Sequence, residues 1–134
     1  MFAHAQNKGT VTVPSNYSVE QTMDRLLAIA AAKEITIFSR INFAADAARV
    51  GLTMRDAQLL IFGTPSAGTP IIQAAPLAAL DLPLKILVWE DVGQKIWATY
   101  NALDYLGARH GISRQLLKPL AGIASMVSQA VQPD

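Results

Sequence analysis

The sequence contains no cysteine, which excludes disulfide bonds, thiolate metal sites and a cysteine nucleophile. Charge is scarce as well: only 16% of the 134 residues are charged, against about 25% in an average globular protein, and the formal net charge is +1. The Lys and Arg residues are scattered singly, whereas nucleic-acid-binding proteins cluster them in patches. We therefore expect no nucleic-acid partner.

Long hydrophobic runs are also missing. No apolar run approaches the ~20 residues that a membrane-spanning helix needs, so we expect no membrane span. The start, MFAHAQNKG, lacks the basic and apolar regions of a signal peptide, although Ala3-His4-Ala5 is similar to the tail of a cleavage site. We expect a cytoplasmic protein, and a periplasmic one is the alternative if the natural N-terminus lies further upstream.

Apolar residues, in contrast, are abundant, at 51% of the chain. A chain of this length suits one domain with one core, so we expect a single domain over 1–134, with a loose tail at 1–8 and a folded part at 10–132. A small domain cannot easily bury this much apolar surface alone, and exposed apolar patches usually mark contact sites. The composition therefore favours a homodimer.

Periodicity predicts the secondary structure. An alternating strand at 10–14 precedes an amphipathic helix at 18–33, which begins with a capping box formed by Ser18 and Gln21. Strands are expected at 35–41 and 58–62 and in a hairpin at 84–101, with a short helical stretch at 42–51. From residue 102 the pattern is helical, with a break at Pro119. The order strand, helix, four strands, helix predicts an α+β fold: one antiparallel sheet with helices on one face.

The hairpin decides which side chains share a face of this sheet. A two-residue turn at Val92-Gly93 pairs Val88 with Trp97, which places both on the same face. That face would be a liability in water, so we predict that it forms the dimer interface. Its expected members are Phe38, Ile86, Val88 and Trp97.

The stretch IFGTPSAGTP, residues 61–70, has nearly the spacing of a phosphate-binding loop. Such a loop needs Lys and then Ser or Thr after its second glycine, but Thr69 and Pro70 stand there instead. Without the Lys the main cationic partner of a phosphate is missing, and Pro70 also removes an amide donor. The stretch is more typical of a turn from strand to helix, capped by Thr64 or Thr69, with Pro70 able to open the helix.

Three ordered motifs resemble the domain of unknown function 302 family: QLLIFGTPSAGTPIIQ at 58–73, DLPLKILVWED at 81–91 and YNALDYLGARHG at 100–111. The resemblance covers about residues 18–132. It implies an α+β fold similar to the TATA-binding-protein-like architecture and a tendency to form homodimers, while the family has no established activity. The chain departs from the family pattern at Asn42-Phe43, where members often carry Asp-His, and at Thr64 and Ser66, where they often carry Asn and Lys. This chain therefore cannot use that family histidine as a ligand or a proton carrier.

Few residues could carry chemistry. His110 is the one candidate for acid-base work, with Glu90 or Asp104 as its partner, but a histidine before Gly111 also suits the C-terminus of a helix. No second His or Cys lies at ligand spacing, so we expect no metal site, and nothing indicates a cofactor. Other residues match the family motifs or lie where a strand passes into a helix, a usual rim for a pocket. These ligand-pocket candidates are Gly63, Gly68, Thr69, Trp89, Tyr100, Asn101 and His110.

Three functions fit these observations. The first is a homodimeric, non-catalytic accessory module that binds a small ligand, such as an apolar molecule, or a protein partner. The second is a small enzyme that uses His110 with Glu90 or Asp104 as acid and base. The third is a purely structural dimer. The abundance of apolar residues and the scarcity of acid-base and metal groups favour the first.

Overall fold

The structure, a computed structural model, describes residues 9–134, so the expected tail at 1–8 and His4 lie outside the described residues. Its centre is one five-stranded open antiparallel sheet with the strand order β1-β5-β4-β3-β2. The strands are β1 (Thr10–Ser15), β2 (Thr36–Asn42), β3 (Ala57–Gly63), β4 (Leu84–Glu90) and β5 (Ile96–Asn101). The predicted α+β class with a single antiparallel sheet is therefore confirmed.

The helices lie between and after the strands. α1 begins with the predicted capping box, in which the Ser18 hydroxyl accepts from the Gln21 amide at 3.0 Å and the Gln21 side chain accepts from the Ser18 amide at 3.1 Å. The last helical segment is interrupted around Pro119, as the pattern predicted. The bounds are α1 (Val19–Ala32), α2 (Phe43–Arg49), α3 (Pro65–Ala74), η2 (Pro76–Leu80), α4 (Leu103–His110), α5 (Arg114–Leu117), η3 (Lys118–Leu120) and α6 (Ile123–Val131).

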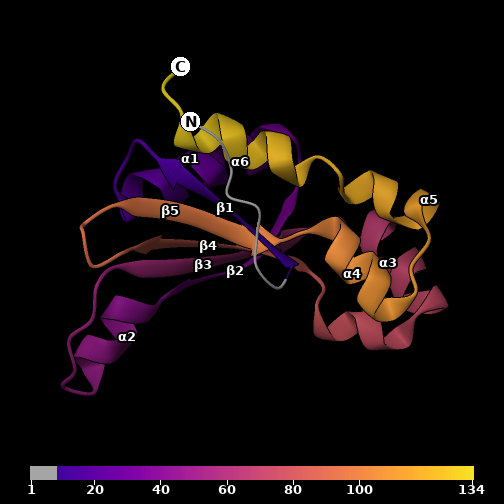
Figure 1. The fold of residues 1–134 in the computed structure, drawn as a ribbon, viewed down its shortest axis with the longest axis horizontal. Coiled ribbons are helices and arrows are strands. Elements are labelled where there is room, and N and C mark those ends of the chain that lie inside the picture. Colours follow the sequence, from indigo (N-terminus) through magenta and orange to yellow (C-terminus); the bar gives the residue numbers. More distant parts are fainter. Residues whose placement is uncertain (1–8) are drawn as a thin grey trace.

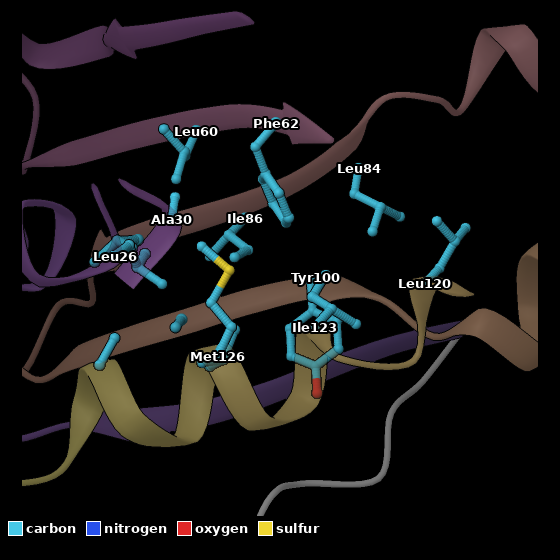
Figure 2. Close-up of a cluster of buried hydrophobic side chains, with 14 of the residues drawn as sticks. Leu26, Ala30, Leu60, Phe62, Leu84, Ile86, Tyr100, Leu120, Ile123 and Met126 are labelled. Carbon is cyan, nitrogen blue, oxygen red and sulfur yellow. The ribbon is translucent and has the colours of Figure 1, made fainter. Parts of the chain in front are cut away.

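The core lies between one face of the sheet and the helices α1 and α6, which cover that face side by side (Figure 1). On β3 and β4 every second residue is buried, because successive strand residues point to opposite faces. Figure 2 shows the side chains of Leu26, Ile86 and Met126 meeting in this core. The chain's own helices therefore seal this face of the sheet. Each fully buried Leu, Ile or Met side chain contributes about 1.5–3 kcal/mol to the stability of the fold.

The opposite face of the sheet is not covered by any helix of the described chain (Figure 1). We call it the open face. Its residues are only half-buried, since the neighbouring strands shield them from the side but no described helix lies above them. The Lys95 ammonium lies over the Trp97 ring, 5.3 Å from its centroid. The apolar residues of the open face are Ile41, Ala57, Leu59, Ile61, Leu87, Trp89 and Trp97.

The β4–β5 hairpin has a register that differs by one residue from the predicted one. Val88 pairs with Ala98, and Trp89 pairs with Trp97. Because the side-chain period of a strand is two residues, a shift of one moves Trp97 from the face of Val88 to the opposite face. The prediction that Val88 and Trp97 share a face is therefore wrong, and Trp97 lies beside Trp89 on the open face.

The hairpin loop explains this register. The Asp91 amide donates to the Lys95 carbonyl at 2.8 Å, so three residues, not two, form the loop between them. Gln94 takes a left-handed conformation with φ of 66°, as three-residue hairpin loops require at their last position. The Asp91 carboxylate holds the loop closed by accepting from the amides of Gly93 and Lys95.

Candidate functional site

His110 lies at the C-terminus of α4, as one of the two sequence interpretations expected. Its imidazole Nε2 is 2.5 Å from the Asp81 carboxylate, and its side chain is only 5% exposed. The same Asp81 oxygen also accepts from the Arg109 guanidinium at 2.9 Å. Asp81 therefore joins the end of α4 to the loop that leads into β4.

The expected partners Glu90 and Asp104 do not contact His110. Glu90 ends β4, where its amide donates to the Asp56 carbonyl, and Asp104 is an exposed residue in the first turn of α4. No hydrogen bond or ion pair joins either carboxylate to His110 in the described part of the chain. The space beside His110, enclosed by core residues such as Leu106 and Ile71, leaves no room for a water molecule. This geometry suits a structural clamp better than an acid-base site.

Three other candidates lie apart from any common site. The Trp89 indole nitrogen donates to the Thr99 hydroxyl at 2.9 Å on the open face. The Tyr100 ring belongs to the core, as Figure 2 shows, and burial raises the pKa of its hydroxyl. Asn101 ends β5 but does not cap the next helix, because the N-cap residue of α4 is Ala102.

The glycine-rich stretch forms a turn from β3 to α3 rather than a phosphate loop. α3 begins at Pro65 with Thr64 as its N-cap residue, so Pro70 lies inside the helix and does not open it. Pro65 suits the first helical position because its missing N–H has no intrahelical partner there. The Thr64 side chain makes no capping hydrogen bond. The turn therefore leaves this hydroxyl at the start of α3, next to Gly63.

A pocket of about 280 Å³ lies beside this turn, and we call it the α3 pocket. Three of the predicted ligand-pocket residues line it: Gly63, Gly68 and Thr69. Trp89, Tyr100, Asn101 and His110 do not. The complete lining consists of Phe38, Gly63, Thr64, Pro65, Gly68, Thr69, Ile72, Leu82, Pro83, Leu84 and Leu120.

The predicted dimer-interface residues fall into three places. Ile86 and Val88 have 0% exposure under the helices, so the prediction that they form an interface is wrong. Trp97 lies on the open face, where its indole nitrogen donates to the Asp91 carboxylate at 2.8 Å. Phe38 is half-exposed at a register shift in β2 and lines the α3 pocket.

Two features of this region were not predicted from the sequence. Asp81, the partner of His110, stands in the DLPLK motif, and Leu82 and Pro83 of the same motif line the α3 pocket. Asp81 is the one acidic residue between the glycine-rich stretch and β4, so its place in a motif was an available signal. Leu120 gave no such signal, because only the tertiary fold brings η3 to this end of the sheet.

The described residues form neither a cluster of metal ligands nor a membrane-spanning helix. Within residues 9–134 no three His, Cys, Asp or Glu side chains are grouped so that they could hold a metal ion. The helices of the same region are all too short or too polar to cross a bilayer. Neither finding adds a candidate to the α3 pocket and the open face.

Known proteins similar to this chain include two Brucella proteins. They are named Fluoride-specific ion channel FluC 1, from Brucella suis biovar 1 (strain 1330), and Fluoride-specific ion channel FluC 2, from Brucella melitensis biotype 1 (strain ATCC 23456 / CCUG 17765 / NCTC 10094 / 16M). Each is 38% identical over 106 residues, which is 79% of this chain. The match covers only 42% and 39% of their lengths, so the chain spans about two fifths of these relatives.

A solved structure and a family model each match nearly the whole chain. The crystal structure of an uncharacterized conserved protein DUF302 from Bacillus stearothermophilus superposes with a TM-score of 0.73, at 15% sequence identity, over 92% of this chain and 95% of that one. The family model described as Domain of unknown function DUF302 matches residues 11–131. The fold, the ordered motifs and this match agree, and the chain belongs to the family Domain of unknown function DUF302.

Proposed function

We propose that this chain is a non-catalytic accessory module that works as a homodimer through the open face of its sheet and binds a small ligand or a protein partner. The observation that carries the proposal is the open face itself. It presents Trp89, Trp97 and five aliphatic side chains that no described helix covers. Contiguous apolar surface of this kind is typical of protein contact sites.

The area of the open face sets a condition on the dimer. Five strands about 4.8 Å apart, each rising about 3.3 Å per residue over six residues, make a face of roughly 500 Å². A standard stable interface buries about 800 Å² per partner. The open face therefore supplies only part of the contact, and a neighbouring surface must supply the rest.

α2 and the loop after it provide that neighbouring surface. Figure 1 shows α2 projecting from the sheet on the side opposite α1 and α6. No residue of α2 is buried, and Val50, Leu52 and Met54 in the following loop are 71%, 65% and 44% exposed. An apolar loop at the margin of an apolar face suits one continuous interface with a second copy.

The accessory role draws support from the relatives. The chain corresponds to about two fifths of longer proteins named for an ion channel, so a related segment occurs there beside other sequence. The helices of residues 9–134 could not themselves cross a membrane. We propose that the segment assists an activity located elsewhere, and we do not assign that activity to this chain.

The enzyme alternative has one observation in its favour, the hydrogen bond between His110 and Asp81. An acid or base must reach the proton that it transfers, directly or through one water molecule. The space beside His110 leaves no room for a water molecule, and Arg109 donates to the same Asp81 oxygen that His110 contacts. The pair therefore favours the accessory role over catalysis.

Light scattering coupled to size exclusion at micromolar concentration tests the dimer. We expect the wild type at twice 14.4 kDa, and Trp97→Lys at the monomer mass, because dimerisation would take the added charge on the open face out of water. Val92→Lys is the matched control, since Val92 is 82% exposed at the hairpin tip. Leu59→Lys provides a second interface variant if Trp97→Lys is not folded by circular dichroism. A wild type that elutes as a monomer contradicts the proposal.

A further inference from the structure

The α3 pocket has walls from distant parts of the chain. β2 contributes Phe38, the β3–α3 turn contributes Gly63 and Thr64, and the segment before β4 contributes Leu82 and Pro83. Leu84 and Leu120, each less than 10% exposed, belong both to the pocket and to the core. The pocket therefore reaches the helix-covered side of the sheet, so a second copy on the open face would not fill it.

The chemistry of the lining restricts what can bind. None of the described residues that line the α3 pocket is charged, so a buried charge on a ligand would have no counter-ion among them. The polar side chains of the lining are the hydroxyls of Thr64 and Thr69, and the Thr64 hydroxyl is not used to cap α3. The lining therefore suits a neutral, mainly apolar molecule with one or two hydrogen-bonding groups.

The size of the pocket restricts the ligand further. Its volume of about 280 Å³ is roughly twice that of the ~150 Å³ apolar cavity that holds benzene in a well-studied engineered protein, and lies just below the usual range for drug-sized ligands. A molecule of two fused rings, or an aliphatic molecule of similar volume, matches this space. The half-exposed Phe38 ring offers such a molecule an aromatic face.

The wall formed by Leu82 and Pro83 is held in place by the contact between Asp81 and His110. Asp81 directly precedes Leu82 and Pro83, and its carboxylate is fixed by His110 at 2.5 Å and by Arg109 at 2.9 Å. A pocket whose walls are already fixed loses little entropy when a ligand binds. Asp81 and His110 are thus positioning residues for the α3 pocket.

We infer that the α3 pocket binds a small neutral molecule of about two-ring size, with an apolar body against Phe38 and Leu120 and a hydroxyl or carbonyl group at Thr64. This inference deepens the binding role proposed above, because it names the ligand class and the site. It does not depend on the dimer. A ligand of this class would lie with its polar group near the mouth of the pocket, where Thr64 is exposed.

Titration of the full chain with 2-naphthol tests the inference, with 2-naphthoate as the charged ligand of the same ring size. We expect 2-naphthol to bind with a Kd in the low millimolar range (~1–5 mM), the affinity expected for ~11 heavy atoms at the ligand efficiency of drug-sized molecules. The amide resonances of Gly63, Gly68 and Thr69 should shift. 2-Naphthoate should bind at least ~10-fold more weakly, because its charge would be buried without a partner.

Two variants locate the site. In Gly63→Ala the new methyl would lie 3.6 Å from Pro83 and 3.8 Å from Phe38, which fits without a clash but occupies the pocket, so we expect 2-naphthol to bind at least ~10-fold more weakly. Thr64→Val removes only the hydroxyl and should weaken binding by a smaller factor. Leu77→Ala is the control, since Leu77 is 71% exposed and outside the pocket, and its affinity should equal that of the wild type.

Three results would overturn the inference: no shift of the pocket resonances, equal affinity for 2-naphthoate, or unchanged affinity in Gly63→Ala. Light scattering on the same samples separates the two proposals. A dimer that does not bind 2-naphthol supports the dimer proposal and contradicts the ligand inference. A monomer that binds 2-naphthol supports the ligand inference and contradicts the dimer proposal.

Discussion

Removal of the Asp81 carboxylate tests whether the motif residues Asp81 and His110 support the structure. In Asp81→Ala the His110 ring, 5% exposed, loses its hydrogen-bond partner. A buried polar group left without a partner destabilises a protein by about 1–3 kcal/mol. The ion pair with Arg109, whose side chain is 47% exposed, adds about 0–1 kcal/mol. We expect the free energy of unfolding to fall by about 2 kcal/mol.

Urea unfolding followed by tryptophan fluorescence measures this loss. With a typical m value of about 2 kcal/mol per molar urea, the midpoint should fall by roughly 1 M at unchanged m. Asp81→Asn keeps an oxygen that can accept from His110 and should lose less. Asp104→Ala is the matched control, because it removes an exposed carboxylate from the same helix, α4, that carries His110.

Two results would refute this reasoning. One is an Asp81→Ala variant whose unfolding free energy lies within about 0.5 kcal/mol of the wild type, the usual range for surface substitutions. The other is a loss in Asp104→Ala as large as that in Asp81→Ala. Either result would mean that the bonds of Asp81 do not hold the wall of the α3 pocket, and the positioning role would fail with them.

Two further predictions concern stability. The hydrogen bonds from the Trp97 indole and the Lys95 amide lower the pKa of Asp91 below its ordinary 3.8. The Asp91 carboxylate therefore stabilises the folded state above pH ~4, and this stabilisation is lost as the pH falls through the lower, folded-state pKa. Asp91→Asn should therefore destabilise the protein at pH 7 and differ less from the wild type at pH 3, by urea unfolding at both values; an equal difference would contradict the assignment. Arg25 donates to the Ala130 carbonyl at 2.8 Å and to two other carbonyls at the C-terminal end of α6. Arg25→Ala should therefore lower the free energy of unfolding by about 1–2 kcal/mol and lower Tm by roughly 5 °C in a thermal scan. An unchanged Tm would show that these bonds are not stabilising.

Local signals predicted most of the fold. The capping box of Ser18 and Gln21 marked the start of α1, alternation marked the strands, and Pro119 marked the break before α6. Each of these features depends on residues a few positions apart, so the sequence alone contains the necessary information. The hairpin register failed for the opposite reason. It depends on the Asp91 side chain closing a three-residue loop and on the left-handed Gln94, and Gly93 in the turn pointed to a two-residue loop instead.

The candidate site was less accessible to prediction than the fold. His110 was identified as the one histidine of interest, but its partner Asp81 lies 29 positions away, across a hairpin and a helix. Glu90 and Asp104 were predicted as partners because they are close to His110 in the sequence. Closeness in the sequence does not predict which side chains lie close together around a sheet. Gly63, Gly68 and Thr69 line the same pocket because they belong to one local turn, and their role in ligand binding stays a prediction. Phe38 and Leu120 reach the same pocket only through the tertiary fold.

The three family motifs meet at one end of the sheet, and their contributions there are steric rather than acid-base. The first motif supplies Gly63 and Thr64, the second supplies Asp81 with the wall formed by Leu82 and Pro83, and the third supplies His110, which fixes Asp81. The glycine and the proline shape the cavity, and the Nε2 of the buried His110 is bound to the Asp81 carboxylate beside it. The three motifs therefore share one structural role in shaping the α3 pocket, and the proposal that this pocket binds a neutral molecule rests on that shape.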